Sequence, residues 1–313
     1  MKHVFRAPLL FGLSLVLLFS AFTGTSEISP EATSVISDTR AQKFASVVFF
    51  YFGDSKFTSL GQETVQLKHA MDGYDRVVLL KHDNVSSFWD LSEKDEKLAD
   101  IKKTPTETNL KDQLKDLSEK GYVIDLWIFS HGSTSGFRAS TGTYGSNSTF
   151  STSDITGLPS YAGRTNLPIR MVFTVACYGN TWADEWQSIG AKTVVAPRYV
   201  NFYPNQFEKF AKEWNDNETA KTARDEADTA LSRTASQAYI LADAVASKNE
   251  WGGCPFGKTV LGDHDCAKDY FTDQWLANSE WQNGQSGKDN MNHSSTYLIK
   301  GNGNIKKNQV PTW

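Results

Sequence analysis

The sequence of 313 residues has no excess of positive charge, since 32 Lys and Arg stand against 36 Asp and Glu for a formal net charge of -4. It therefore lacks the basic footprint of a nucleic-acid-binding protein. Gly and Pro together contribute only 31 residues and no internal repeat is present, which excludes a collagen-like chain. After the first 25 residues, no apolar run is long enough to span a bilayer. These absences leave a globular protein, and nine Trp among 12% aromatic residues can supply a substantial core.

The first residues have the three-part pattern of a secretory signal. Lys2 and Arg6 precede an apolar run over residues 9–19, and small and polar residues follow it. The run is shorter than the ~20 residues that cross a bilayer, which favours a cleaved signal over a membrane anchor. No Cys follows it, as one would in a bacterial lipoprotein. We expect a signal peptide over 1–24, a linker or propeptide over 25–44, and a secreted or periplasmic mature chain of formal charge -6 that does not bind membranes.

The chain has only three cysteines, and export would place them in an oxidising compartment. Cys254 and Cys266 stand 12 positions apart in a Gly-rich stretch of the C-terminal extension 251–313, where they could close a local disulfide. Cys177 is then the odd cysteine. In a secreted protein such a residue is either a reactive thiol or a small buried apolar side chain.

Apolar runs alternate with helical segments along residues 45–250, which we expect to form one domain. Several runs are almost continuously apolar, as strands are when helices cover both faces of a parallel sheet. The predicted fold class is therefore α/β, a three-layer sandwich with a mostly parallel sheet between helices. The expected strands cover 46–52, 76–80, 122–129, 167–175 and 193–196, and the expected helices cover 60–74, 104–120, 182–189, 207–214 and 220–246.

Two polar segments lie between these elements. In the charge-rich stretch 90–120, Thr104 as N-cap, Pro105 at the first helical position and Glu107 predict the start of a helix that Gly121 ends. The charges of this stretch are expected to lie on solvated helix faces. Residues 133–153 are rich in Ser, Thr and Gly and are expected to form a loop.

His131 and Cys177 each stand at the end of an expected strand. Ser130-His131-Gly132 follows one strand, and Ala176-Cys177-Tyr178-Gly179 ends the next. In open α/β sheets, ligands and reactive groups lie at the carboxyl ends of the strands. Because neighbouring strands are about 4.8 Å apart, the two side chains reach one crevice if their strands are neighbours.

A thiol beside an imidazole can perform nucleophilic catalysis. The thiolate is the attacking species, and an ordinary thiol with a pKa of about 8.5 is mostly protonated at neutral pH. His131 could remove that proton as a general base or hold the thiolate in an ion pair. The backbone N–H groups of Gly132 and Cys177 are candidate donors to the oxyanion of a tetrahedral intermediate. Gly179 would keep the turn after Cys177 tight.

The two strand-terminal motifs, with His131 and Cys177 separated by 46 positions, resemble those of the caspase-like cysteine peptidases. This superfamily, clan CD, includes caspases, metacaspases, legumain, gingipains, clostripain, separase and CHAT domains. The resemblance covers about residues 46–246. It implies a caspase-like three-layer fold and endopeptidase activity, with Cys177 as nucleophile, His131 as general base and acid, and the N–H of Gly132 in the oxyanion hole. It also implies, in many members, maturation by self-cleavage.

The sequence departs from the individual families of this superfamily. Val175 precedes Ala176 where caspases have Gln, and the Glu that legumain and gingipains tend to show before Ala-Cys is absent. The resemblance therefore identifies the superfamily and not a member.

The leading interpretation is a secreted cysteine endopeptidase that cleaves peptide bonds through a thioester acyl-enzyme. Two alternatives stay open. The first is a Cys-nucleophile α/β-hydrolase acting as an esterase, with His264 or His293 as base; the residue at Val175 is larger than that fold prefers. The second is a non-catalytic, caspase-like peptide-binding module.

The expected partner is a peptide or protein substrate. The sequence Asp263-His264-Asp265 is interpreted as a polar loop rather than a metal site. We therefore expect no metal or other cofactor, and nothing in the sequence indicates calcium.

Overall fold

The structure, a computed structural model, describes residues 42–52, 67–82, 97–198, 201, 205–229 and 296–313. The predicted signal peptide 1–24 and the predicted Cys254–Cys266 disulfide lie outside these residues, as does most of the extension 251–313. Within the described part of the chain, none of the helices has the length and apolar character to cross a membrane.

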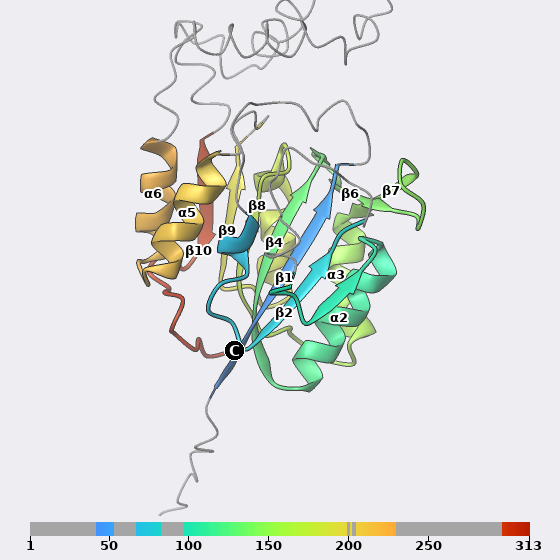
Figure 1. Cartoon of the computed structure of the whole chain (residues 1–313), viewed down its shortest axis with the longest axis horizontal. Helices are drawn as coiled ribbons and strands as arrows, with labels where there is room; N and C mark the ends of the chain where they lie inside the picture. Colours follow the sequence, from blue (N-terminus) through green and yellow to red (C-terminus); the bar gives the residue numbers. More distant parts are fainter. Residues whose placement is uncertain (1–41, 53–66, 83–96, 199–200, 202–204, 230–295) are drawn as a thin grey trace, which may run out of the picture. The chain divides into compact units, whose positions relative to one another are not determined.

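A sheet of seven strands forms the centre of the described residues (Figure 1). Its order is β10-β9-β8-β4-β1-β2-β3, and every neighbouring pair is parallel except β9 and β10. The strands are β1 (Lys43–Tyr51), β2 (Arg76–Leu80), β3 (Ile101–Lys103), β4 (Tyr122–Ser130), β8 (Ile169–Thr174), β9 (Thr193–Pro197) and β10 (Tyr297–Gly301).

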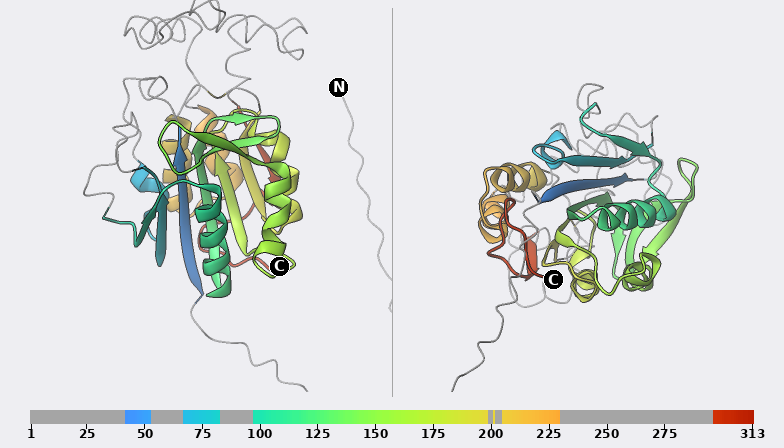
Figure 2. Two further views of the ribbon diagram at one scale, coloured as in Figure 1. Left: turned by 90° about the vertical axis from the view of Figure 1, so that its right-hand side faces the viewer. Right: turned by 90° about the horizontal axis from the view of Figure 1, so that it is seen from below.

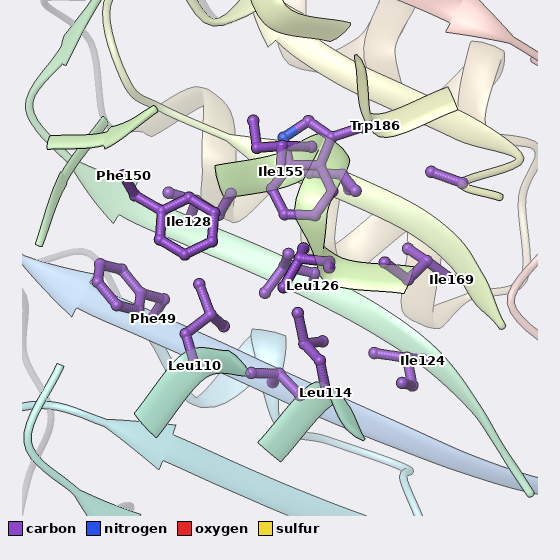
Figure 3. Close-up of a cluster of buried hydrophobic side chains, with 14 of the residues drawn as sticks. Phe49, Leu110, Leu114, Ile124, Leu126, Ile128, Phe150, Ile155, Ile169 and Trp186 are labelled. Atoms are coloured by element: carbon purple, nitrogen blue, oxygen red, sulfur yellow. The ribbon is translucent and has the colours of Figure 1, made fainter. Parts of the chain in front are cut away.

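Helices cover both faces of the sheet (Figures 1 and 2). One face packs against α2 (Glu107–Glu119), α3 (Thr152–Tyr161), the 3-10 turn η3 (Gly179–Trp182) and α4 (Ala183–Ser188). The other packs against the 3-10 turn η2 (Leu67–Ala70), α5 (Asn205–Asn215) and α6 (Ala220–Thr229). Buried side chains of α2, α3 and α4 interdigitate with those of β1 and β4 in the first layer (Figure 3). The predicted three-layer α/β fold with a mostly parallel sheet is confirmed.

A second, antiparallel sheet follows β4 directly, where the sequence predicts a polar loop. It consists of β5 (Gly132–Ser133), β6 (Gly136–Ser140) and β7 (Asn147–Ser151), and α3 begins at its end. Phe137 and Phe150 face each other across β6 and β7, with ring centroids 5.0 Å apart, and Phe137 also packs on Trp182 at 5.6 Å. The loop prediction was wrong because these few apolar residues alternate with Ser and Thr, and their partner Trp182 is distant in the sequence.

The predicted start of helix α2 was wrong by two residues. Its N-cap is Thr106, whose Oγ1 accepts a hydrogen bond from the backbone N–H of Asn109 at 3.1 Å. Pro105 is not the first helical residue, because its carbonyl accepts the backbone N–H of Ser140 at 2.9 Å. Gly121 follows the helix with φ +75°, as predicted for a helix stop.

Two strands at the edges of the main sheet were missed. β3 has only three residues, two of them exposed lysines, within the stretch interpreted as helical surface. β10 lies in the predicted C-terminal extension and pairs antiparallel with β9. An edge strand pairs on one side only, so it needs neither a long nor a continuous apolar run. Of the predicted helix 60–74, the structure describes only residues 67–74, and these contain the 3-10 turn η2.

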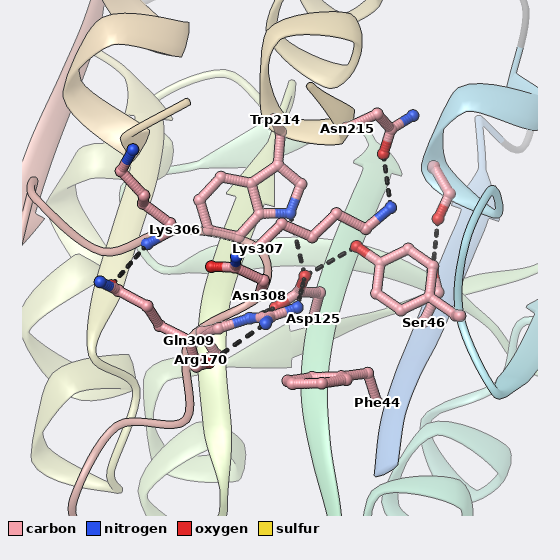
Figure 4. A network of polar contacts seen from close by, with 12 residues as sticks. Phe44, Ser46, Asp125, Arg170, Trp214, Asn215, Lys306, Lys307, Asn308 and Gln309 are labelled. Carbon is pink, nitrogen blue, oxygen red and sulfur yellow. Dashed lines mark hydrogen bonds and ion pairs between the residues drawn. The ribbon is translucent and has the colours of Figure 1, made fainter. Parts of the chain in front are cut away.

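A buried ion pair joins β4 and β8 near their amino ends (Figure 4). The Arg170 guanidinium donates to both carboxylate oxygens of Asp125 at 2.9 and 2.7 Å, and both residues are 0% exposed. Trp214 Nε1 and the Tyr74 hydroxyl donate to the same carboxylate at 3.0 and 2.7 Å. Arg170 is the extra residue at a register shift, because Ile124 pairs with Ile169 but Asp125 pairs with Met171. This bulge lets Arg170 point to the face that Asp125 occupies.

Candidate active site

The strand before His131 and the strand before Cys177 are neighbours in the sheet. In their parallel register, Trp127 lies opposite Phe173 and Ile128 opposite Thr174, an offset of 46 positions. The backbone N–H of Val175 continues the pairing by donating to Ile128 O at 3.0 Å. His131 and Cys177 are also separated by 46 positions. His131 and Cys177 thus each stand three positions beyond the last paired residues, Ile128 and Thr174, at the carboxyl edge of the sheet.

The imidazole of His131 lies beside the face of the sheet that α5 and α6 cover. Side chains alternate between the faces along a strand, and Phe129 and Val175 point into the core under α5 and α6. His131 and Cys177 stand two positions further along. The ring of Phe52, which packs against the same core, meets the His131 imidazole edge-on with centroids 5.4 Å apart. Both His131 and Cys177 are partly exposed.

Gly132 lies in direct contact with the backbone of Cys177. A Cβ atom at position 132 would stand 2.2 Å from Cys177 O and 2.9 Å from Cys177 N, so only glycine fits. The N–H of Arg138 donates to His131 O at 2.9 Å, which makes that pair of the β5–β6 hairpin a hydrogen-bonded one. Hydrogen-bonded and non-hydrogen-bonded pairs alternate in antiparallel strands. The next pair, Gly132 with Phe137, is thus a non-hydrogen-bonded one, and the Gly132 N–H points away from β6.

The turn after Cys177 is tight and strained. Tyr178 adopts the left-handed region with φ 59°, which costs a residue with a side chain about 1–2 kcal/mol. The N–H of Gly179 closes the turn by donating to Ala176 O at 3.0 Å. A Cβ at Gly179 would approach Thr174 Cγ2 to 2.7 Å, so the turn can lie this close to β8 only with glycine there. Strained backbone of this kind is typical of functional sites.

Two hydrogen bonds tie the loop after His131 to the turn after Cys177. Thr181 Oγ1 donates to Thr134 O at 3.1 Å, and Trp182 Nε1 donates to Ser133 O at 3.2 Å. The pairing of β4 with β8 holds the two segments where they leave the sheet, and these two hydrogen bonds hold them further along the chain. Sequence analysis missed these contacts, since nothing in a Ser/Thr-rich stretch marks which carbonyls will meet Thr181 and Trp182.

The Cys177 thiol is free and lies in a desolvated environment. Burial raises its pKa above the ordinary value, and backbone hydrogen bonds from Asn201 and from Cys177 itself oppose this rise. The thiol is therefore protonated at neutral pH in the resting protein, so a reaction at the sulfur requires a base to accept its proton.

Two further residues that the sequence analysis missed lie beside the thiol. Tyr297, on β10, is fully buried, and its hydroxyl accepts a hydrogen bond from Asn201 Nδ2 at 2.8 Å. Burial raises the pKa of this phenol most, the hydrogen bond from Asn201 lowers it, and the charges of Asp228 and, least of all, Cys177 raise it. Tyr297 stands 120 positions after Cys177 in a polar stretch, so no sequence signal marked it.

No cluster of three His, Cys, Asp or Glu side chains that could hold a metal ion occurs among the described residues. Asp263, His264 and Asp265 lie outside them, as does His293.

Comparisons with known proteins find a distant structural likeness. No protein-family model matches the sequence, and no curated protein matches it. Among solved structures, the chain is similar to a secreted C11 cysteine protease from Bacteroides thetaiotaomicron, solved in complex with an irreversible peptide inhibitor. The identity is 9% and the TM-score is 0.33, over 55% of this chain and 53% of that protease, about half the length of each. A likeness this low says nothing about what the present chain binds or cleaves.

Proposed function

We propose that the chain is a cysteine endopeptidase in which Cys177 is the nucleophile and His131 transfers the protons. The observation that carries the proposal is that His131 and Cys177 follow neighbouring parallel strands whose register has the same offset of 46 positions. The close approach of Gly132 to the Cys177 backbone supports it further, because it places the two residues proposed to donate to the oxyanion side by side.

In this mechanism His131 acts as a general base rather than as the partner of a permanent thiolate. Because burial keeps the thiol protonated, the imidazole accepts its proton as the sulfur attacks the scissile carbonyl carbon. The carbonyl oxygen becomes an oxyanion, to which the N–H groups of Gly132 and Cys177 donate.

Collapse of the tetrahedral intermediate breaks the C–N bond. The imidazolium of His131 gives its proton to the leaving amine, and a thioester links the acyl group to Cys177. His131 then removes a proton from water, which attacks the thioester carbonyl. The acid product leaves, and the thiol takes the proton back.

The test is cleavage of a peptide panel by the full chain and by Cys177→Ala and His131→Ala. Both variants should lose at least ~1000-fold in kcat/KM with unchanged thermal unfolding. His69→Ala is the matched control, because His69 lies on η2, near Asp72 and Glu208, and should retain activity. Acyloxymethyl ketone probes carrying Asp, Arg, Lys or Asn should label Cys177 and report the preferred residue. Cleavage that survives in either site variant would refute the assignment.

A non-catalytic peptide-binding module is the second candidate, and the raised pKa of the Cys177 thiol favours it. It predicts that Cys177 in the folded protein resists iodoacetamide at every pH up to its unfolding limit. The esterase alternative needs His264 or His293. Ester turnover that depends on His264 and not on His131 would support that alternative.

Export is also part of the proposal, and it rests on the first 24 residues of the sequence. A mature protein recovered outside the cytoplasm, with an N-terminus between residues 22 and 27, is the expected result. Recovery of the intact N-terminus from the cytoplasm would contradict it.

A further inference from the structure

The imidazole of His131 contacts an aromatic ring from the neighbouring strand β1. β1 and β4 pair in parallel up to Tyr51 and Ser130, and Phe52 and His131 are the next residues of the two segments. Their rings meet edge-on, with centroids 5.4 Å apart and planes at 90°. β4 lies between β1 and β8 in the sheet. Phe52 therefore approaches His131 from the β1 side, whereas Cys177 follows the strand on the other side.

A row of aromatic rings holds Phe52 in turn. Phe50, two residues earlier on β1, meets the Phe52 ring edge-on with centroids 5.4 Å apart. Phe50 also contacts Phe129 of β4 at 6.3 Å, and Phe129 meets Phe207 of α5 edge-on at 4.7 Å. These three supporting rings are at most 2% exposed. The row thus extends the core under α5 to the ring that contacts the imidazole.

Phe52 differs from the rings behind it in its position. It stands just beyond the last residue of β1, and it is partly exposed. Its burial therefore contributes less to folding than that of Phe50, because less apolar surface is removed from water. Its ring lies where the aromatic core ends and the proposed catalytic imidazole begins.

An imidazole that acts as a general base has to be held toward the proton that it removes. The χ2 angle of histidine is only weakly restricted by the side chain itself, so its orientation depends on the surroundings. Edge-to-face contact between aromatic rings is directional. It involves the ring as a whole rather than one nitrogen, so it persists while His131 gains and loses its proton.

We propose that Phe52 is a positioning residue for His131, whose ring fixes the imidazole in the orientation in which it accepts the Cys177 proton. This inference rests on the proposed function and adds a residue to the same site. Phe52 acts through the imidazole and not on the substrate.

The first test compares variants that lose the ring with one that keeps it, in the full chain and with a peptide that the wild type cleaves. Phe52→Leu removes the ring and keeps an apolar side chain. Its kcat should fall about 10–100-fold with KM little changed, because the base is misplaced while substrate binding is intact. Phe52→Tyr keeps the ring and should retain most of kcat. Phe52→Met should show the same loss as Phe52→Leu, and it tests the proposal even where Phe52→Leu does not fold.

The second test measures the mobility of the His131 imidazole and does not depend on activity. The full chain is labelled with ¹³C in the histidine rings, and the signal that is absent from His131→Gln identifies residue 131. The order parameter of its Cε1–H bond should fall in Phe52→Leu and Phe52→Met. It should stay at the wild-type value in Phe52→Tyr.

Phe44→Leu is the matched control. Phe44 lies on the same strand, eight residues before Phe52 and on the same face, and it is also partly exposed. Its ring contacts the Arg170 guanidinium, which lies 4.6 Å from the ring centre, at the amino end of the sheet (Figure 4). This variant loses an aromatic ring and its polar neighbour but should leave both kcat and the His131 order parameter unchanged.

The proposal requires both losses, so an unchanged kcat or an unchanged order parameter in the two ring-free variants would overturn it. Equal losses in Phe52→Tyr or in Phe44→Leu would overturn it as well. Cys177-dependent cleavage with an unchanged kcat in the ring-free variants would remove the positioning role and leave the peptidase standing. The absence of any Cys177-dependent cleavage would instead refute the proposed function, while a lower order parameter would still show that Phe52 fixes the imidazole.

Discussion

The same two strands, β4 and β8, carry polar side chains at both ends, and the two ends differ in how those side chains are satisfied. At the amino end, Asp125 and Arg170 are fully buried and form a bidentate ion pair. Trp214 and Tyr74 donate hydrogen bonds to the same carboxylate. At the carboxyl end, His131 and Cys177 are partly exposed, and the turn after Cys177 includes a left-handed residue.

The difference separates a polar cluster that stabilises from one that can react. Arg170, Trp214 and Tyr74 all donate to the Asp125 carboxylate. Loss of either charged residue would therefore leave the other charge buried without compensation. At the carboxyl end the thiol is free, and burial raises its pKa above the ordinary value. Both pairs belong to the same two neighbouring strands, so their positions along the chain, within the strands or just beyond them, decide between these roles.

The largest effect on stability is expected from a substitution that removes the Asp125–Arg170 ion pair at the amino end of β4 and β8. Arg170→Met leaves Asp125 buried without its partner and should lower the free energy of unfolding by about 3–5 kcal/mol. Urea denaturation measures this loss, while peptide cleavage per folded molecule should stay at the wild-type level. Adding Asp125→Leu should restore much of the stability. A cleavage defect as large as the stability loss would show that the two ends are coupled.

A smaller effect on stability, with a large one on activity, is expected from Gly132→Ala at the carboxyl end. The added Cβ would meet Cys177 O at 2.2 Å and push the two loops apart. A displacement of this size should lower kcat/KM about 100-fold and the free energy of unfolding by about 1–3 kcal/mol.

Gly157→Ala is the control for this substitution, because no atom lies within 4 Å of a Cβ there and the residue is inside α3. It should stabilise the protein slightly and leave cleavage unchanged. Equal activity losses in the two variants would contradict the proposed role of the Gly132 contact.

A third prediction uses Asp228, which holds the N–H of Tyr297. Burial raises the pKa of this carboxyl to about 6, against the opposing effect of that N–H. In the unfolded chain an Asp titrates at about 4, so between these values the folded protein binds more protons. Its stability therefore falls as the pH rises from about 4 to 6, by about 1–2 kcal/mol after allowance for solvent screening.

Asp228→Asn should remove this decline, as chemical denaturation at several pH values between 4 and 7 would show. The amide oxygen can still accept from Tyr297 and Gln206. A decline that persists in the variant would assign the effect to another carboxyl group.

The smallest effect is expected from Lys307, at the amino end of the strands. Its contribution to the pH dependence of stability has the opposite sign to that of Asp228. Its Nζ lies 4.2 Å from the ring centre of Tyr74, and burial lowers its pKa to about 8. The unfolded chain binds more protons between pH 8 and the ordinary lysine pKa of about 10.4, so stability rises with pH by about 1 kcal/mol. Lys307→Met should flatten the curve of unfolding free energy over this range, and an unflattened curve would refute the attribution.

The sequence allowed prediction of those features that depend on local runs. Continuous apolar segments located β1, β2, β4, β8 and β9, and residues placed directly after two of them gave the candidate pair. His131 and Cys177 could be placed on one edge because parallel strands all end there. Their common level could not be derived, since it depends on the strand order and on the bulge at Arg170.

The features that were missed depend on contacts between distant residues. Asp125 and Arg170 interrupt two apolar strands, and only the strand pairing shows that each charge compensates the other. Tyr297 and Asn201 meet because β10 returns to the sheet edge from the C-terminal end of the sequence. The three-stranded sheet after His131 has too few apolar residues to be distinguished from a loop.

The offset shared by the β4–β8 register and the candidate pair has a consequence for changes in chain length. Residues added between the two strands enlarge loops on the outside of the layers and leave the imidazole and the sulfur side by side. One residue added inside either strand, after the bulge, would turn its terminal side chain to the opposite face. Homologous sequences and insertion libraries should therefore vary freely in the total count between histidine and cysteine, but not in the number of residues from Asp125 to His131 or from Met171 to Cys177.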